Sequence, residues 1–164
     1  MTKTQNTILA LDPGLRDLGY AVLRGSRIVA GGVLPLRFLP RKGRSRYART
    51  AVRTWIEAHR PSAVVLERTH RHPVGSLHDL YLLTRAVSRI AHAERIPVAT
   101  YPAQTVRKSL TGYGWSVKRE VAGIIAARYP QLRLYLTQDK RWKERYWQNY
   151  FDAIALALHH RTVR

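Results

Sequence analysis

Three of the chain's ten acidic residues lie in apolar stretches of the sequence, where we expect their carboxylates to be buried. Asp12 and Glu67 each follow an unbroken apolar run, and Asp152 has apolar neighbours on both sides. Burying an isolated carboxylate costs several kcal/mol, so each of these acids needs a compensating partner. That partner can be an Arg side chain, a proton or a divalent cation.

Each acid also has an ordinary structural interpretation. Asp12 begins an Asp-Pro-Gly sequence and could cap the turn that follows. Glu67 could pair with Arg68 at a strand end, and Asp152 could be satisfied by a backbone amide or a nearby Arg. These interpretations stay open for each residue taken alone. Surface pairing is a sufficient explanation for the acids in Arg-rich segments, which are Glu57, Glu94, Glu120 and Glu144.

Taken together, the three acids favour a metal site. If the two strands are neighbours in one sheet, Asp12 and Glu67 lie at the same edge, and a helix carrying Asp152 has to cross that edge. If each acid had only the separate structural role described above, their meeting at one edge would be a coincidence. Oxygen ligands suit Mg²⁺ or Mn²⁺, and two such ions are a standard device for hydrolysing phosphodiesters.

The first third of the chain predicts an antiparallel meander. Apolar runs at 7–11, 18–23 and 27–33 predict strands, joined by turns that contain Pro or Gly. Short connections of this kind join antiparallel neighbours. We expect residues 35–46, which hold five cations and no apolar periodicity, to form a loop.

The rest of the chain predicts alternating strands and helices. The strands are residues 97–101 and the fully apolar run 63–66, which is typical of a parallel strand buried on both faces. Helical spacing of apolar residues predicts helices over 47–59, 75–94, 103–110, 117–129 and 148–160. We therefore expect one α/β domain over residues 1–164, with a five-stranded mixed sheet covered by helices and ligands near the carboxyl ends of the parallel strands.

The charge balance points to a polyphosphate partner. The chain has 29 Lys and Arg against 10 Asp and Glu, for a formal net charge of +19. Arg supplies most of these cations, and its planar fork suits bidentate contacts with phosphate. Because 45% of the residues are hydrophobic, the chain can build a core, which excludes a disordered polycation.

Cysteine content and hydropathy narrow the class further. The absence of cysteine excludes disulfides, thiolate zinc sites and a cysteine nucleophile. No apolar run approaches the roughly 20 residues that span a bilayer, and the first residues lack a secretory hydrophobic segment. The cations are spread over the whole chain instead of one helix face, which disfavours membrane binding. We expect a soluble, cytoplasmic protein that binds nucleic acid and no membrane.

Four segments resemble the RuvC family of Holliday-junction resolvases. They are the opening motif at 8–14 with 19–22, the second acidic motif at 65–67, the basic segment at 106–118 and the terminal helix at 152–157. In this order they cover nearly the whole chain. Actin-like ATPases share the Asp-Pro-Gly motif but need two such domains, and this chain is too short for them.

The resemblance implies a ribonuclease H-like fold and a homodimer that nicks four-way DNA junctions in recombination and repair. It also implies two Mg²⁺ or Mn²⁺ ions per active site, bound by Asp12, Glu67 and Asp152. The position of a fourth ligand, usually Asp and sometimes His, falls on Asn149, one helical turn before Asp152. An amide oxygen can bind a hard cation but adds no charge, so metal affinity should be weaker. A branch-migration helicase is a further partner that the resemblance suggests.

Basic and aromatic residues supply candidate DNA contacts. Lys118 and Arg107 match family positions near the scissile phosphate, where a cation neutralises developing charge, so Lys118 is also a catalytic candidate. Generic phosphate contact is the alternative. His70 takes a position that is aromatic in some relatives, although a solvated loop residue fits it as well. The other candidates are Tyr113 and Trp115 for stacking, and Arg41, Lys42, Arg44, Lys108, Arg119, Arg141 and Lys143 for phosphate.

Two other functions stay open. Asn149 can be a natural variant, an engineered change from Asp, or the mark of a protein that binds junctions without cutting them. A ribonuclease H-like nuclease acting on RNA or on another branched substrate would carry the same acids. The three carboxylates favour the junction nuclease over a pure binding protein, because a protein that only binds DNA has no need of buried acids.

Overall fold

The predicted meander and parallel strands join in one five-stranded sheet with the order β3-β2-β1-β4-β5. The computed structural model describes residues 6–136 and 141–164, without the side chains of 141–145. The strands are β1 (Thr7–Pro13), β2 (Asp17–Arg24), β3 (Arg27–Pro35), β4 (Ala63–Glu67) and β5 (Val98–Tyr101). β1 pairs antiparallel with β2 and parallel with β4, so the mixed sheet is confirmed.

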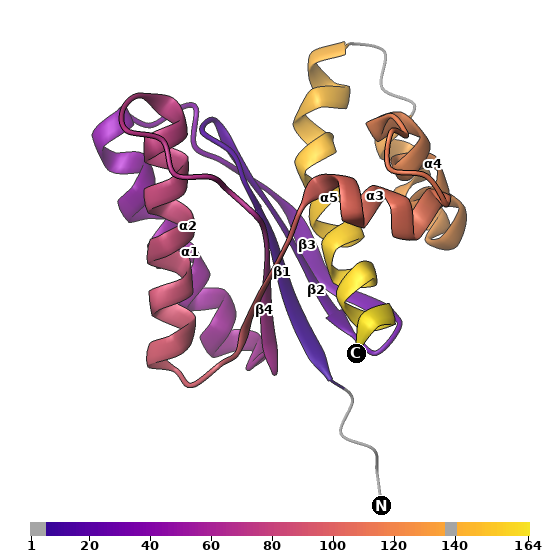
Figure 1. The fold of residues 1–164 in the computed structure, drawn as a ribbon, viewed down its shortest axis with the longest axis horizontal. Helices are drawn as coiled ribbons and strands as arrows, with labels where there is room; N and C mark the ends of the chain where they lie inside the picture. The colour runs from indigo at the N-terminus through magenta and orange to yellow at the C-terminus, as the bar shows by residue number, and fades with distance from the viewer. Residues whose placement is uncertain (1–5, 137–140) are drawn as a thin grey trace, which may run out of the picture.

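Helices cover both faces of the sheet (Figure 1). The helices are α1 (Arg41–His59), α2 (Ser76–Ala93), α3 (Ala103–Thr111), α4 (Lys118–Arg128) and α5 (Arg141–Val163), with a 3₁₀ turn η1 at Pro130–Tyr135. α1 and α2 lie on one face, and α5 lies on the other with α3 and α4 beyond it. In the part of the chain that the structure describes, no helix is long and apolar enough to cross a membrane.

The two faces of the sheet differ in the size of their side chains. Leu9, Leu11 and Leu66 point toward α1 and α2, where they form one core cluster. The alternate positions Ala10 and Ala21 point toward α5 in a second cluster. Because small residues line its path, α5 can approach the strands closely.

Two glycines set the closest approach of α5. A Cβ built on Gly19 of β2 would lie 2.0 Å from the backbone oxygen of Asn149, and one on Gly31 of β3 would lie 2.4 Å from the Tyr150 ring. Real Cβ atoms do not come so close to other atoms, so a larger residue at Gly19 has to move the backbone of α5, and one at Gly31 has to displace the Tyr150 ring. The backbone of α5 thereby sits directly against the strand that pairs with Asp12.

Three predicted boundaries were wrong. Residues 41–46 are the first turns of α1 and not part of a loop, because exposed Arg and Lys are good helix formers even without an apolar stripe. α5 begins at Arg141 instead of residue 148, because its first residues include Arg, Lys and Glu, which are good helix formers. β1 continues through Asp12 to Pro13, because these two residues pair with Gly19 and Leu18.

Substituting Gly19 tests the close approach of α5. We expect Gly19→Ala to lower the free energy of unfolding by about 2–4 kcal/mol, because the added methyl group must push the helix away. Gly43→Ala is the matched control: a Cβ there meets nothing within 4 Å, and alanine in a helix should stabilise by about 0.5–1 kcal/mol. Urea unfolding measures both. Equal stability of the two variants would contradict the described packing.

Candidate active site

Strand register brings the first two acids together. Leu11 of β1 is level with Leu66 of the parallel strand β4, so Asp12 and Glu67 are the next residues on neighbouring strands. Side chains alternate along a strand, and both acids fall on the face that carries Ala10 and Val65. This is the face that α5 covers. The predicted convergence of the two strand ends is therefore confirmed.

The third acid reaches this edge from α5. Lys118 Nζ donates a hydrogen bond of 2.5 Å to Asp152 Oδ2, and Gln148 Nε2 donates one of 3.0 Å to Oδ1. The Asp152 side chain is only 14% exposed, so the ammonium of Lys118 is its main charge compensation. The compensating cation comes from α4, whereas the sequence had suggested a nearby Arg.

Asp12 and Glu67 lack such compensation. Neither carboxylate has a hydrogen bond or ion pair with another residue in the described part of the chain, although Arg68 follows Glu67 directly. Asp12 is 9% exposed. Burial raises the pKa of Asp12 well above its usual range, and the charges of Asp152 and Glu67 raise it further, against a smaller opposite effect of Lys118.

The same field acts on the neighbouring groups. Burial raises the pKa of Glu67, the charge of Asp152 adds to the increase, and Lys118 and Arg107 oppose it. Partial burial works against the charged form of Lys118, but the pull of Asp152, Asp12 and Glu67 outweighs it and raises the pKa of the ammonium. The site thus holds more negative charge than its own cations balance.

A small hollow lies among these groups. It has a volume of about 20 Å³ and is lined by Glu67, Arg107, Lys118 and Asp152, which is room for about one water molecule or a bare cation. The three carboxylates at this edge, Asp12, Glu67 and Asp152, offer oxygen ligands only, which fits a hard divalent cation. Among the described residues, no three acidic or histidine side chains already stand at ligand spacing, and Lys118 occupies one oxygen of Asp152.

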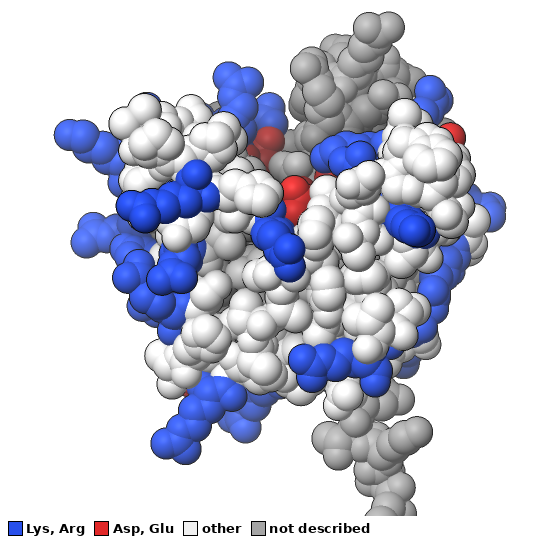
Figure 2. Space-filling model, in the orientation of Figure 1, with Lys and Arg blue, Asp and Glu red and all other residues white. Residues whose placement is uncertain are grey.

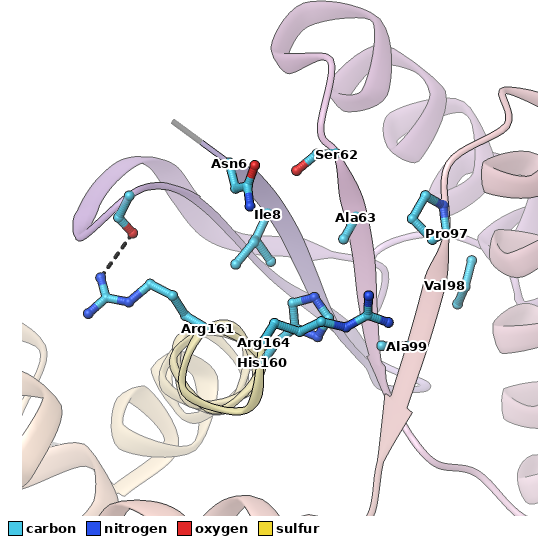
Figure 3. A pocket seen from close by; sticks show the side chains of 11 residues that line it. Asn6, Ile8, Ser62, Ala63, Pro97, Val98, Ala99, His160, Arg161 and Arg164 are labelled. Carbon is cyan, nitrogen blue, oxygen red and sulfur yellow. Dashed lines mark hydrogen bonds between the residues drawn. The ribbon is translucent and has the colours of Figure 1, made fainter. Parts of the chain in front are cut away.

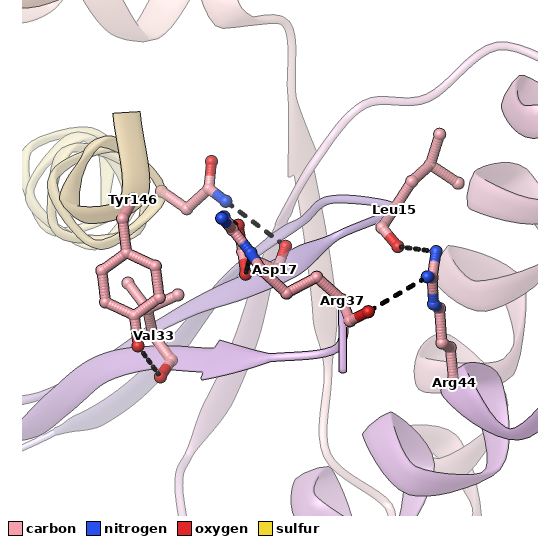
Figure 4. Close-up of polar contacts among 7 residues, drawn as sticks. Leu15, Asp17, Val33, Arg37, Arg44 and Tyr146 are labelled. Carbon is pink, nitrogen blue, oxygen red and sulfur yellow. Dashed lines mark hydrogen bonds and ion pairs between the residues drawn. The ribbon is translucent and has the colours of Figure 1, made fainter. Parts of the chain in front are cut away.

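Asn149 lies on α5 beside the loop that follows β1. Its Nδ2 donates a hydrogen bond of 3.3 Å to the backbone oxygen of Asp17, leaving Oδ1 as the atom available to a cation. Asp17 in turn is held by an ion pair with Arg37 (Figure 4). This chain of contacts fixes the loop between Asp12 and β2 against α5.

Several basic candidates for DNA contact are accessible around the site. Arg107 lines the hollow beside Glu67, and Lys108, Arg119 and His70 are exposed. Figure 2 shows few acidic side chains on this face, and those in the hollow between the helical layers have Lys and Arg around them. A phosphate approaching the carboxylates therefore meets cations first.

The candidates at the start of α1 have mixed roles. Arg44 donates hydrogen bonds to the backbone oxygens of Leu39, Leu15 and Arg37, so its guanidinium fixes the loops at this end (Figure 4). Arg41 pairs with Asp79 of α2 at 2.5 Å. Lys42 is exposed and has no such partner in the described residues. The side chains of the candidates Arg141 and Lys143 lie outside the described residues.

The aromatic pair in the turn before α4 is accessible. Trp115 is 81% exposed, and its ring centroid lies 5.4 Å from that of Tyr113. The hydroxyl of Tyr113 donates to Glu120 at 2.8 Å, which fixes this ring beside Lys118. The pair is thus placed where a base could stack on it.

The sequence did not single out two residues that shape the site. Gln148 holds the second oxygen of Asp152, and its spacing of four residues before Asp152 on a helix is a signal that could have found it. Arg37 secures Asp17, but the two are 20 residues apart and no local pattern links them.

A larger cavity lies at the opposite end of the sheet (Figure 3). It has a volume of about 220 Å³ and is lined by Asn6 and Ile8 of the first strand's start, Ser62, and His160 and Arg161 near the end of α5. Tyr101 hydrogen-bonds His160 at 2.8 Å, and burial lowers the pKa of this histidine. Because Asp12 and Glu67 stand at the other ends of the strands, this cavity takes no part in the carboxylate site.

The sheet order and the three acids, on β1, β4 and the last helix, define a ribonuclease H-like fold with an acidic site. The model of the family described as "Crossover junction endodeoxyribonuclease RuvC" matches residues 8–160. The chain belongs to this family, as the sequence motifs predicted.

Individual relatives agree over nearly the full length. The protein of that name from Maricaulis maris (strain MCS10) is 31% identical over 165 residues, covering 95% of this chain and 92% of the relative. One from Alkalilimnicola ehrlichii is 31% identical over 159 residues, covering 93% and 89%. The structure of T. thermophilus RuvC in complex with Holliday junction substrate matches with a TM-score of 0.74 at 26% identity, covering 95% and 93%.

Removing the charge of Asp12 should stabilise the metal-free protein. A buried carboxyl whose pKa is raised on folding favours the folded state only when protonated, so at pH 7.5 its charge is destabilising. In EDTA, we expect Asp12→Asn to raise the free energy of unfolding by more than about 1 kcal/mol, since one pKa unit corresponds to about 1.4 kcal/mol. Glu94→Gln, on the exposed surface, should change little. A less stable Asp12→Asn variant would contradict the repulsion among the acids.

Proposed function

We propose that this protein is a structure-specific endonuclease that resolves four-way DNA junctions by metal-dependent phosphodiester hydrolysis. The observation that carries the proposal is the convergence of Asp12, Glu67 and Asp152 at one edge of the sheet, with Lys118 and Arg107 beside them. Membership of the family supports the reaction type. The matching complex of T. thermophilus RuvC with a Holliday junction substrate supports the junction as substrate.

The three carboxylates and the Oδ1 of Asn149 would hold two divalent cations, Mg²⁺ or Mn²⁺. Bound there, the cations would supply Lewis acidity and positive charge for phosphodiester hydrolysis. The protein's own contribution is to keep the carboxylates of Asp12 and Glu67 free of hydrogen bonds and largely buried, while Lys118 and Gln148 orient the carboxylate of Asp152. An amide instead of a fourth carboxylate lowers the negative charge of the set, so we expect weaker cation binding than with Asp at this position.

Lys118 and Arg107 would act on the DNA. Both carry positive charge into the hollow beside Glu67 and Asp152, where they can bind the scissile phosphate and stabilise its developing charge. Tyr113 and Trp115 offer stacking faces next to this position. His70, Lys108 and Arg119, all exposed, would add contacts to the DNA backbone.

We further propose that the protein acts as a homodimer in the cytoplasm. Two-fold symmetry of a dimer matches the paired nicks that resolve a junction. Leu77, near the start of α2, is 50% exposed, and we expect this apolar side chain to take part in the subunit contact. A branch-migration helicase as a further partner rests on the family resemblance alone.

The direct test is nicking of an end-labelled four-way junction. We expect cleavage in Mg²⁺, none in EDTA, and none of a linear duplex of the same sequence. Asp12→Asn and Glu67→Gln should bind the junction but lose about 100-fold or more in rate, since the cations contribute several kcal/mol. Glu57→Gln is the matched control on the exposed surface of α1. Equal cutting of junction and duplex, or an active Asp12→Asn variant, would contradict the proposal.

The same assay examines Asn149. Asn149→Asp should nick faster than the wild type in Mg²⁺, because it restores a fourth carboxylate, and Asn149→Ala should nick more slowly. An unchanged or lower rate for Asn149→Asp would remove this residue from the ligand set. Junction binding by the wild type without any cleavage would instead identify a catalytically impaired binding protein.

A further inference from the structure

An arginine-lined groove runs between α1 and α2, on the layer away from α5. It has a volume of about 470 Å³ and is lined by Arg49 and Arg53 of α1 and by Arg89 of α2. Ala86, Ile90 and Ala93 provide an apolar floor, and Glu94 is the single acid in its lining. Figure 2 shows Lys and Arg side chains gathered over this layer, on the left of the view.

The guanidinium groups of this groove are uncompensated. Within the described residues, the ion pairs involve Arg37, Arg41 and Lys118, and none involves Arg49, Arg53 or Arg89. The Nε of Arg49 is buried and lacks a hydrogen-bond partner among the described residues. A buried donor of this kind favours a bound acceptor, because leaving it unpaired costs free energy.

The spacing of cations along α1 is regular. Lys42, Arg46, Arg49 and Arg53 follow one another at intervals of four, three and four residues, so they form one stripe on the helix surface. Eleven residues of helix span about 16 Å, which is about the rise of five base pairs along a duplex axis at 3.4 Å each. An extended polyanion with regularly spaced charges suits this stripe.

The groove continues toward the carboxylate site. At the other end of the same α1–α2 seam lies a hollow of about 530 Å³, lined by Lys42 of α1, Ser76 of α2, and Gly14 and Leu15 of the loop that follows Asp12. On both helices, the residues that line the groove begin one turn after the last residue that lines this hollow. The seam thus leads from the loop beside Asp12 down the flank of the molecule.

We propose that this α1–α2 groove binds the phosphate backbone of a DNA arm leading away from the carboxylate site. This inference rests on the proposed junction-cleaving function and assigns DNA contacts to Arg49, Arg53 and Arg89. A second copy of the chain is a poor occupant, because a symmetric contact would bring six guanidinium groups together. An acidic protein segment lacks the regular charge spacing that matches the stripe.

The test compares two triple variants that remove the same charge. In the groove variant Arg49, Arg53 and Arg89 become Gln, and in the control variant the exposed Arg24, Arg27 and Arg133 become Gln. Binding of a four-way junction is measured by fluorescence anisotropy in EDTA over a range of salt concentrations. Each lost phosphate contact should make the log–log salt slope shallower by about one unit, so we expect a change of about three units and at least tenfold weaker binding at about 100 mM salt for the groove variant only.

Further measurements separate the outcomes. Replacing the same three residues with Lys should preserve the slope, and thermal melting checks that all variants are folded. Suppose that the wild type binds and nicks the junction and that the groove variant has the same affinity and salt slope. This result would overturn the groove assignment and leave the proposed function intact. Equal losses of DNA affinity in both triple variants would also overturn it. Poly-glutamate serves as a probe for an acidic protein segment: if the groove variant lost poly-glutamate binding but kept DNA binding, the groove assignment would be overturned as well. A wild-type protein that neither binds nor nicks a junction would instead refute the proposed function.

Discussion

The burial of Asp12 and Glu67 close to Asp152, which adds charge repulsion to the loss of hydration, is the constraint on which the rest of this structure depends. Strand register and side-chain alternation place the first two on one face of the sheet, and α5 brings the third. Burial intensifies the repulsion, because charges interact more strongly away from water. Small residues on the strands let α5 bring Asp152 close to the other two acids. The ammonium of Lys118 offsets part of the repulsion without neutralising all three charges. This shortage of positive charge is what we propose a divalent cation would relieve.

Much of this arrangement could be predicted from the sequence, because it depends on local patterns. A fully apolar run ending in Glu67 indicates a buried parallel strand, and parallel neighbours end at the same edge of a sheet. The start of α1 could not be found this way, since its first turns are exposed and carry no apolar period. The pairing of Lys118 with Asp152 joins residues 34 positions apart and depends on how α4 packs against α5. The role of Gly19 likewise appears only when the helix is in place.

The Lys and Arg residues, whose excess gives the net charge of +19, are of two kinds in the described part of the chain. Some have structural roles, and others have no acidic partner. Arg37 and Arg44 hold the loops around Asp17 and Leu15, and Lys118 serves the acidic site. Most other Arg side chains have no acidic partner among the described residues, because the chain has few acids to offer. Under the proposed function, this surplus of cations would bind phosphate, and the few acids gathered at one edge of the sheet would carry the chemistry.

Binding of Mn²⁺ to the protein without DNA tests the cation site directly, and the loss of the free-ion signal in electron paramagnetic resonance measures it. We expect the wild type to bind Mn²⁺, and Asp12→Asn and Glu67→Gln each to weaken binding by at least about tenfold. Glu57→Gln should bind as the wild type does. Equal binding by the wild type and the two site variants would contradict the claim that these carboxylates hold the cation.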